Sequence, residues 1–237
     1  MAFTTFNDPD LGEVRVSVRA NATRITGRWA DGRVLIIVPR TVTAGIISEA
    51  IARMKPSLLA HRPCSGLFMP GRDLELDGGV IFHFERSPFV DDREIRIDRS
   101  AGGATVRIGQ GIDMSDPATD GMISRLLIRA SLFLAPSVLL PRAAEMASAL
   151  HLTPRSIDIS RGHKVLGHCS RRGDIAISSI CLFLPWELRD YIVCHELAHL
   201  THMDHSSRFH ALCDCYLGGR ERELIRSLNA YRWPVMR

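Results

Sequence analysis

Residues 185–205 read PWELRDYIVCHELAHLTHMDH and contain the motif HExxH at positions 195–199. Proline is common in the first turn of a helix, and Glu187 suits the positive N-terminal end of the helix dipole. Three apolar side chains follow at helical spacing: Leu188, Tyr191 and Ile192. The segment therefore predicts a helix that runs from Pro185 to about Leu200 and carries the motif.

The spacing of the motif places two histidines and one glutamate where a metal site needs them. On a helix His195 and His199 project about 40° apart, so both imidazoles can reach one metal ion. Glu196 is turned about 100° from His195, which puts its carboxylate beside the metal and not on it. Neutral imidazoles bind zinc, zinc lowers the pKa of a bound water to about 7, and a carboxylate can accept the proton. We therefore predict zinc on His195 and His199 with Glu196 as general base. Surface histidines on an ordinary helix are the alternative interpretation.

A catalytic zinc site needs a third protein ligand. Three histidines follow the motif: His202, His205 and His210. We predict His205 as the third ligand, because a turn at residues 203–204 can bring the chain back over the site and Ser206 can cap the next helix. The other two histidines are then expected on the surface or hydrogen-bonded to a ligand. The alternative third ligand is a glutamate of the last helix, Glu221 or Glu223.

Strand patterns dominate the sequence before residue 120. Residues 13–20, EVRVSVRA, alternate between apolar and polar side chains, as a half-buried strand does. Further strands are expected at residues 23–29, 34–38, 80–85, 94–98 and 105–108. A helix is expected at residues 43–54, with Thr43 as its N-cap. Residues 109–119 have the composition of a linker, and no internal repeat is apparent.

Helix patterns begin after residue 120. Helices are expected at residues 121–134 and 141–150, separated by a break at Pro136. Three strands should follow, at residues 156–160, 164–170 and 175–183. After the motif helix, short helices are expected at residues 206–217 and 220–228, the first ended by two glycines. We therefore predict a β-rich domain at residues 10–112 and a second domain at residues 118–237.

The segment HELAHLTHMDHSSRF (residues 195–209) resembles the YgjP-like metallopeptidase family, whose pattern is HELxHLxxxxHSxxFW. The resemblance extends upstream to VLGHCS at residues 165–170, to DY at residues 190–191, and to LPR at residues 140–142. A more distant similarity is to the SprT/Spartan-like proteases, which cleave proteins crosslinked to DNA. The resemblance implies an α+β fold, in which a β-rich part precedes a zincin-like metallopeptidase core with the HExxH helix beside a small sheet. It also implies zinc-dependent hydrolysis of peptide bonds in peptide or protein substrates.

The sequence departs from the family pattern at four positions near the motif. Leu166 stands for a tryptophan, His168 for a serine, Ser178 or Ser179 for an asparagine, and His210 for the tryptophan after Phe209. The predicted ligands and base are retained, so the departures concern the shape and polarity of the substrate cleft. His168 and His210 could donate hydrogen bonds to a tetrahedral oxyanion. Surface substitution without a role is the alternative.

The composition is that of an ordinary globular protein. Hydrophobic residues make up 46% and charged residues 24% of the 237 residues, which argues against disorder. The longest apolar run, residues 126–140, is broken by Arg129 and Pro136, so no membrane span is expected. The N-terminus lacks the basic and apolar segments of a signal peptide. We therefore predict a cytoplasmic protein whose six cysteines are thiols.

A nucleic-acid partner is the second hypothesis. The net charge of +4 is too small to indicate one by itself. Residues 161–172, RGHKVLGHCSRR, are strongly basic and could contact phosphates, as would suit a crosslink protease. A solvated hairpin tip is the alternative, because no aromatic residue is interleaved for base stacking. A binding module with a structural zinc is disfavoured, since such sites have four protein ligands and the sequence offers three.

Overall fold

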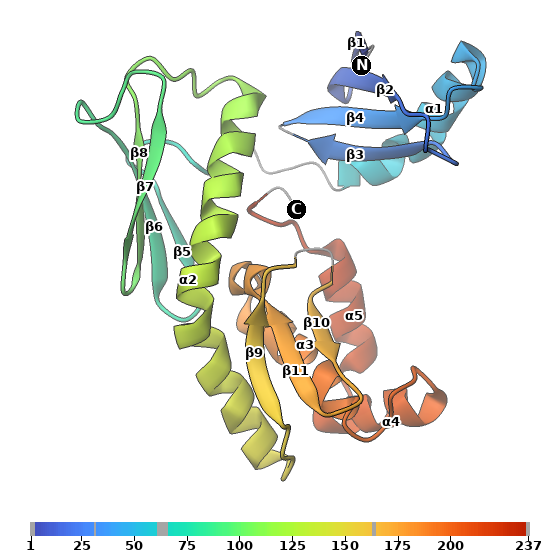
Figure 1. Ribbon diagram of the computed structural model, residues 1–237, viewed down its shortest axis with the longest axis vertical. Coiled ribbons are helices and arrows are strands. Elements are labelled where there is room, and N and C mark those ends of the chain that lie inside the picture. The colour runs from blue at the N-terminus through green and yellow to red at the C-terminus, as the bar shows by residue number, and fades with distance from the viewer. Residues whose placement is uncertain (1–2, 31, 61–65, 163–164, 236–237) are drawn as a thin grey trace.

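Two four-stranded sheets with the same topology form the N-terminal half of the chain (Figure 1). The computed structural model describes residues 3–30, 32–60, 66–162 and 165–235. The first sheet is ordered β1 (Phe3–Asp8), β2 (Gly12–Val18), β4 (Arg33–Val38) and β3 (Thr26–Ala30), and α1 (Ala44–Ala60) follows it. The second is ordered β5 (Asp73–Leu76), β6 (Val80–Arg86), β8 (Gly103–Ile108) and β7 (Ile95–Ser100), and α2 (Pro117–Ala149) follows it. In each sheet the central pair of strands is parallel and the outer pairs are antiparallel.

The two sheets with their helices are an internal repeat, which corrects the expectation that the chain has none. The sequences agree where the two helices begin. Residues 43–54, TAGIISEAIARM, and residues 119–130, TDGMISRLLIRA, carry the same Thr, Gly, Ile, Ser and Arg at matching positions. The strand sequences of the two sheets do not agree in this way, so the repeat is recognised from the topology.

Helix α2 is continuous through Pro136 and Pro141, so the predicted break at Pro136 is wrong. A proline inside a helix removes one backbone hydrogen bond and crowds the carbonyl four residues earlier. Packing compensates, because α2 lies between the second sheet and the C-terminal sheet, and twelve of its residues are buried (Figure 1). By length and composition alone α2 could also cross a membrane, as the core helices of many water-soluble proteins could.

A three-stranded sheet and three helices form the C-terminal part. The strands β10 (Gly167–Cys169), β11 (Asp174–Ser178) and β9 (Ser156–Ser160) lie in that order. The edge strand β10 packs against α3 (Trp186–Ala198), which carries the HExxH motif. Helices α4 (Ser207–Tyr216) and α5 (Glu221–Ala230) complete the fold. The expected α+β class, with the motif helix beside a small sheet, is confirmed.

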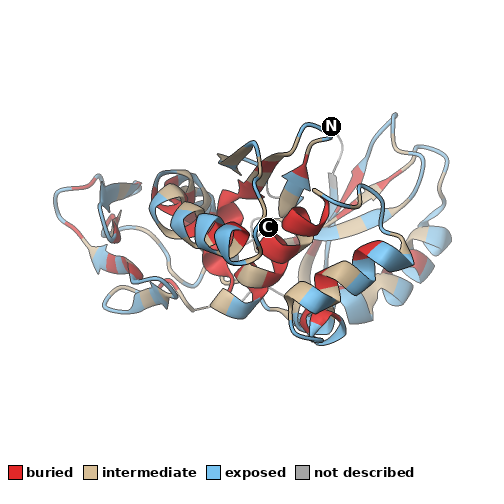
Figure 2. Ribbon diagram, turned by 90° about the horizontal axis from the view of Figure 1, so that it is seen from below, coloured by how far each residue is buried: buried red, intermediate tan, exposed pale blue. Residues whose placement is uncertain are grey.

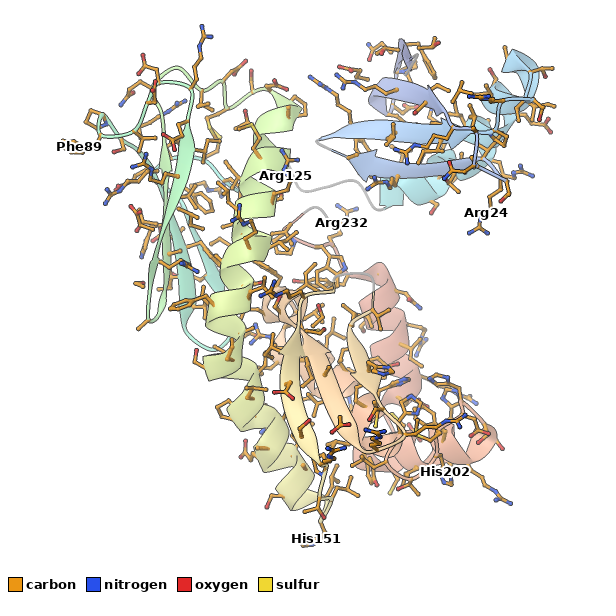
Figure 3. All side chains as sticks on the ribbon, viewed as in Figure 1. Arg24, Phe89, Arg125, His151, His202 and Arg232 are labelled. Atoms are coloured by element: carbon orange, nitrogen blue, oxygen red, sulfur yellow. The ribbon has the colours of Figure 1, made fainter. Side chains whose placement is uncertain are left out.

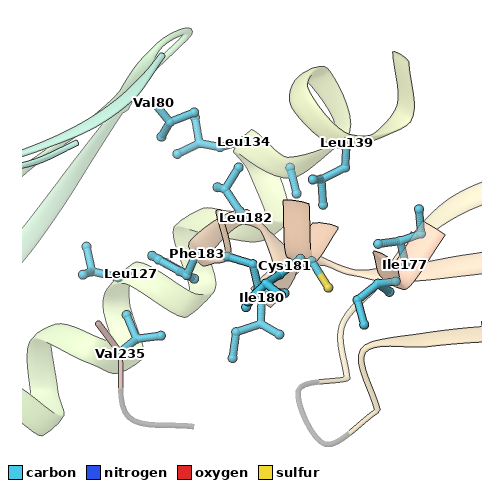
Figure 4. Packing of buried hydrophobic residues seen from close by; sticks show 14 of the residues in the cluster. Val80, Leu127, Leu134, Leu139, Ile177, Ile180, Cys181, Leu182, Phe183 and Val235 are labelled. Carbon is cyan, nitrogen blue, oxygen red and sulfur yellow. The ribbon is translucent and has the colours of Figure 1, made fainter. Parts of the chain in front are cut away.

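The strand expected at residues 175–183 ends at Ser178, and the 3-10 helix η1 (Ser179–Phe183) replaces its second half. The Ser178 hydroxyl accepts a hydrogen bond from the backbone N–H of Ile180 at 3.4 Å, which favours a helical turn. All residues of η1 are buried, and the four from Ile180 to Phe183 belong to the main core (Figure 4). A short apolar run is compatible with a buried strand and a buried helix alike. The strand expected at residues 164–170 is the shorter β10, and Lys164 lies outside the described residues.

Buried apolar side chains form two clusters, and α3 belongs to the larger. Figure 2 colours the buried residues red along the ribbon. The larger cluster joins the second sheet, α2, η1 and the C-terminal helices, whereas the smaller belongs to the first sheet and α1. A fork of two hydrogen bonds from Arg142 to Asp190, 3.0 and 2.7 Å long, also ties α3 to α2. The motif helix is therefore rigidly held. The division at residues 10–112 and 118–237 stays a prediction.

Candidate metal centre

Helix α3 and the turn after it bring three histidines together. His195 lies in the last turn of α3, His199 is the C-cap of that helix, and His205 follows in the turn before α4. One ring nitrogen from each lies within 4.8 Å of the other two, and the Nε2 atoms of His195 and His205 are 3.1 Å apart. The structure thus brings the three histidines predicted as ligands together in one cluster.

The ring of His199 is oriented by the backbone. Its Nδ1 atom lies 2.9 Å from the carbonyl oxygen of His202, which can only accept a hydrogen bond. Nδ1 therefore carries the proton, and Nε2 is the nitrogen left to bind a metal. This contact gives His202 a role through its main chain that the sequence did not reveal. The side chain of His202, labelled in Figure 3, is not part of the histidine cluster.

The ring of Phe209, on α4, packs against all three histidines. Its centroid is 4.4 Å from that of His199 in a stacked arrangement, and 4.8 and 4.9 Å from those of His195 and His205. Phe209 is fully buried, so it forms the floor of the cluster and restricts the orientation of the rings. The sequence identified Phe209 only as a position of the family pattern, because the contacts of a single apolar residue cannot be predicted from the sequence.

Glu196 lies against β10 at Gly167. The glutamate is 4% exposed, and its Oε2 atom has no hydrogen-bond partner among the described residues. An added Cβ atom at Gly167 would lie within 3.0 Å of three atoms of the Glu196 side chain, so the glycine permits this close approach. Burial raises the pKa of Glu196 to about 7. The carboxylate is therefore suited to accept a proton near neutral pH.

The ring nitrogens of His195 and His205 lie about as far apart as two ligands of one metal ion. Bonds of about 2.1 Å in a tetrahedral site separate two ligand nitrogens by about 3.4 Å. The corresponding separation between His195 and His205 is 3.1 Å. Burial lowers the pKa of His195 to about 4 and also lowers that of His199, which keeps these rings neutral, as metal ligands must be. The arrangement can therefore hold a divalent metal that prefers imidazole nitrogen.

The alternative ligands from the last helix lie outside the cluster. Glu221 is buried, and its Oε1 atom is 2.9 Å from Nδ1 of His210. Glu223 is exposed and forms an ion pair with Arg220 at 3.0 Å. The ring centroid of His210 is 6.3 Å from that of His205. His210 thus lies at the edge of the metal centre, and a carboxylate from α5 does not belong to the donor set.

The remaining candidates lie around the β10–β11 hairpin and in the core. His168 of β10 is exposed, as are Arg171 and Arg172 in the turn. The five described cysteines are thiols: Cys169, Cys181, Cys194 and Cys213 are buried, and Cys215 is exposed. Cys213 and Cys215, which are two positions apart in the sequence, thus lie in the core and on the surface, and Cys64 lies outside the described residues.

A cavity of about 420 Å³ opens beside Glu196. Tyr191 and Ile192 form part of its wall one helical turn before His195 and Glu196. The segment that enters β10, the C-terminal end of α5 and the residues just after α5 line the remainder. A molecule bound in this cavity would therefore meet both the metal centre and the buried carboxylate.

Comparison with known proteins gives one match. The sequence profile of the YgjP-like metallopeptidase domain matches residues 25–231, which is most of the chain. The matched region includes α3, the turn with His205, and α4. Searches of curated proteins and of solved structures found no match.

Proposed function

The chain belongs to the YgjP-like metallopeptidase family, and we propose that it is a zinc-dependent peptidase with three histidine ligands and a glutamate base. The ligands are His195, His199 and His205, and the base is Glu196. The proposal is carried by three ring nitrogens within 4.8 Å of one another, next to a buried carboxylate. Three protein ligands leave the fourth position of a tetrahedral site open, as in catalytic zinc sites and unlike structural ones.

The chain's own groups prepare the ligands. Zinc, when bound, polarises the carbonyl of a peptide bond and lowers the pKa of a water molecule. The ring of Phe209 and the carbonyl group of His202 hold the imidazoles in a fixed orientation before a metal binds. The lowered pKa of His195 keeps its ligand nitrogen free of a second proton near neutral pH.

Glu196 moves the proton in this mechanism. Its carboxylate accepts a proton from the attacking water and later donates one to the nitrogen of the leaving amine. Burial makes the carboxylate a stronger base than a solvated one, and a pKa near 7 suits a group that must take and release a proton. The close approach of β10 at Gly167 holds the carboxylate in position.

A nucleic-acid partner stays a prediction. Arg161, Arg171 and Arg172 are exposed near the β10–β11 hairpin, where they could contact phosphates. The same exposure suits a solvated hairpin tip. Binding to DNA that weakens steeply with salt, and that is lost when these arginines are replaced, would support the crosslink-protease alternative.

The experiment that tests the proposal is Glu196→Gln, which keeps the shape of the side chain but removes its basicity. We expect about one zinc per chain and an unchanged fold, with hydrolysis slower by at least about 10²-fold. A proteomic screen that compares peptides released by the wild-type protein and by the variant would identify substrates. Equal turnover of a verified substrate by both proteins would exclude Glu196 as the base. Activity that persists in fully metal-free protein would exclude the metal mechanism.

A further inference from the structure

The cavity beside Glu196 extends from the metal centre along α3. Tyr191 and Ile192 precede His195 and Glu196 by four residues, so one face of the helix carries both the cavity wall and the site. The cavity has a volume of about 420 Å³, which is within the range of pockets that hold small ligands. It therefore has room for a large amino-acid side chain next to the reacting groups.

The lining of the cavity combines apolar side chains with polar groups, among them Tyr191 and Asn229. Its aliphatic and indole side chains come from Val165, Leu166, Ile192, Leu228 and Trp233. The hydroxyl of Tyr231, which also lines it, donates to the carbonyl oxygen of Phe183 at 2.6 Å. Apart from two tyrosines, only His195 and Glu196 among the described lining residues have ionisable side chains, and both are part of the metal centre. A large apolar side chain gains from contact with these five residues, whereas an acidic one would lose hydration and meet the carboxylate of Glu196.

The part of the wall that follows α5 is anchored before any ligand binds. The rings of Tyr231 and Trp233 pack edge to face with centroids 5.4 Å apart. Val235, just after them, is 2% exposed in the main core (Figure 4). A pre-formed wall spares a ligand the entropy cost of ordering it, so the cavity can discriminate between side chains by contact alone.

The position of Glu196 determines which substrate residue faces the cavity. In the proposed function Glu196 donates a proton to the leaving amine, so the amine nitrogen must lie within hydrogen-bond reach of this carboxylate. The side chain nearest that nitrogen belongs to the residue directly after the cleaved bond. We therefore propose that the cavity receives this side chain and that the enzyme prefers a large apolar residue there, such as phenylalanine or leucine. The inference rests on the proposed function for the direction of the substrate.

Amino-acid amides with a free α-amino group mimic the leaving half of a peptide and allow a test without cleavage between residues. With zinc-loaded protein, phenylalanine amide and leucine amide should bind at least about 10-fold more tightly than glycine amide, because their side chains fill the cavity. Aspartate amide should bind no more tightly than glycine amide. Affinities from titration calorimetry decide the matter, and equal affinities or a preference for a charged amide would overturn the inference.

Two variants place a charge in the cavity. Leu228→Glu changes a half-buried wall residue, and Val165→Glu changes a wall residue that is 63% exposed and therefore tolerant of substitution. Both should reduce the preference for phenylalanine amide by about 10-fold. Val18→Glu, an exposed valine of β2 outside the cavity, is the matched control and should retain it. Unaltered selectivity in the two cavity variants, each shown by its melting curve to be folded, would refute the assignment.

Peptide cleavage separates this inference from the proposed function. Wild-type protein should cleave a peptide mixture with large apolar residues directly after the broken bond. Cleavage without a preference at that position would overturn the pocket and leave the proposed function standing. Selective binding of the amides without hydrolysis of any peptide would refute the peptidase and leave an apolar ligand site beside the metal centre.

Discussion

Replacement of Gly167 by alanine tests how the position of Glu196 controls the reaction. A Cβ atom at this residue would lie 2.3 Å from Oε1 of Glu196, 2.6 Å from Cγ and 2.7 Å from Cδ. Ordinary van der Waals contact begins at 3.4 Å, whereas the shortest distance here would be 2.3 Å. Either the carboxylate of Glu196 or the strand β10 must therefore move by about 1 Å. A misplacement of about 1 Å can lower a rate on the order of 10²-fold. We expect a loss of this size in kcat/KM for Gly167→Ala.

The metal should be retained in this variant, because the added atom meets Glu196 and not the histidines. Gly162→Ala is the matched control, since a Cβ there meets nothing within 4 Å in the loop before β10. The assay compares zinc content, melting temperature and peptide hydrolysis among the wild-type protein and the two variants. Hydrolysis by Gly167→Ala at the wild-type rate would refute the reasoning, as would a loss of zinc equal to the loss of activity.

Three further predictions concern the histidines. The double variant of His195→Ala and His199→Ala should bind no zinc, measured as metal per chain after gel filtration, and full occupancy would contradict the ligand assignment. His205→Ala should weaken zinc affinity about 10-fold or more in a chelator competition, whereas His202→Ala and His210→Ala should change it little, because their side chains lie outside the cluster. A larger loss of zinc affinity in His202→Ala or His210→Ala than in His205→Ala would reverse the ligand assignment. Burial lowers the pKa of His195 from its ordinary 6.5 to about 4, so between these values the unfolded chain binds a proton that the folded chain does not. The metal-free protein should therefore lose stability relative to His195→Ala as the pH falls from 6.5 to 4, while the raised pKa of Glu196 acts in the opposite direction in both proteins. Urea unfolding across this range measures the effect, and a slope that stays the same in His195→Ala would assign it to another group.

Most strands could be predicted from the sequence, and the two edge strands β1 and β5 could not. Residues 13–20 alternate between apolar and polar side chains, and residues 34–38 are continuously apolar, as in a strand buried on both faces. They correspond to β2 and β4 at the centre of the first sheet. The missed strands lie at sheet edges: β1 is mostly exposed and has no apolar alternation, and β5, DLEL, alternates over only four residues, which is too short to indicate a strand. The parallel pairing of β2 with β4 depends on chain segments that are distant in sequence, and local patterns do not encode it.

Local rules also fail where tertiary packing outweighs them. Pro136 predicts a helix break and Pro141 the start of a second helix, yet α2 continues through both because its neighbours on two sides stabilise it. The apolar run at residues 179–183 satisfies the pattern of a strand, yet it forms η1 after the cap at Ser178. In both cases the deciding interactions come from segments that the local pattern does not contain.

The candidate site could be predicted because most of it is local. The i, i+4 spacing and the turn before Ser206 bring the three histidines together within a short segment of the chain. The parts that escaped prediction depend on distant or featureless groups. Gly167 meets Glu196 through sheet packing, and the carbonyl of His202 is a group that nearly every residue carries.

An open zinc site with three histidine ligands is tested most directly by a crystal structure of the zinc-loaded protein, with the metal identified by anomalous scattering. We predict one zinc ion bonded at about 2.1 Å to ring nitrogens of His195, His199 and His205, with no protein atom in the fourth position. A fourth protein ligand would make the site structural and contradict the peptidase. Another side chain bonded in place of His205 would contradict the ligand set.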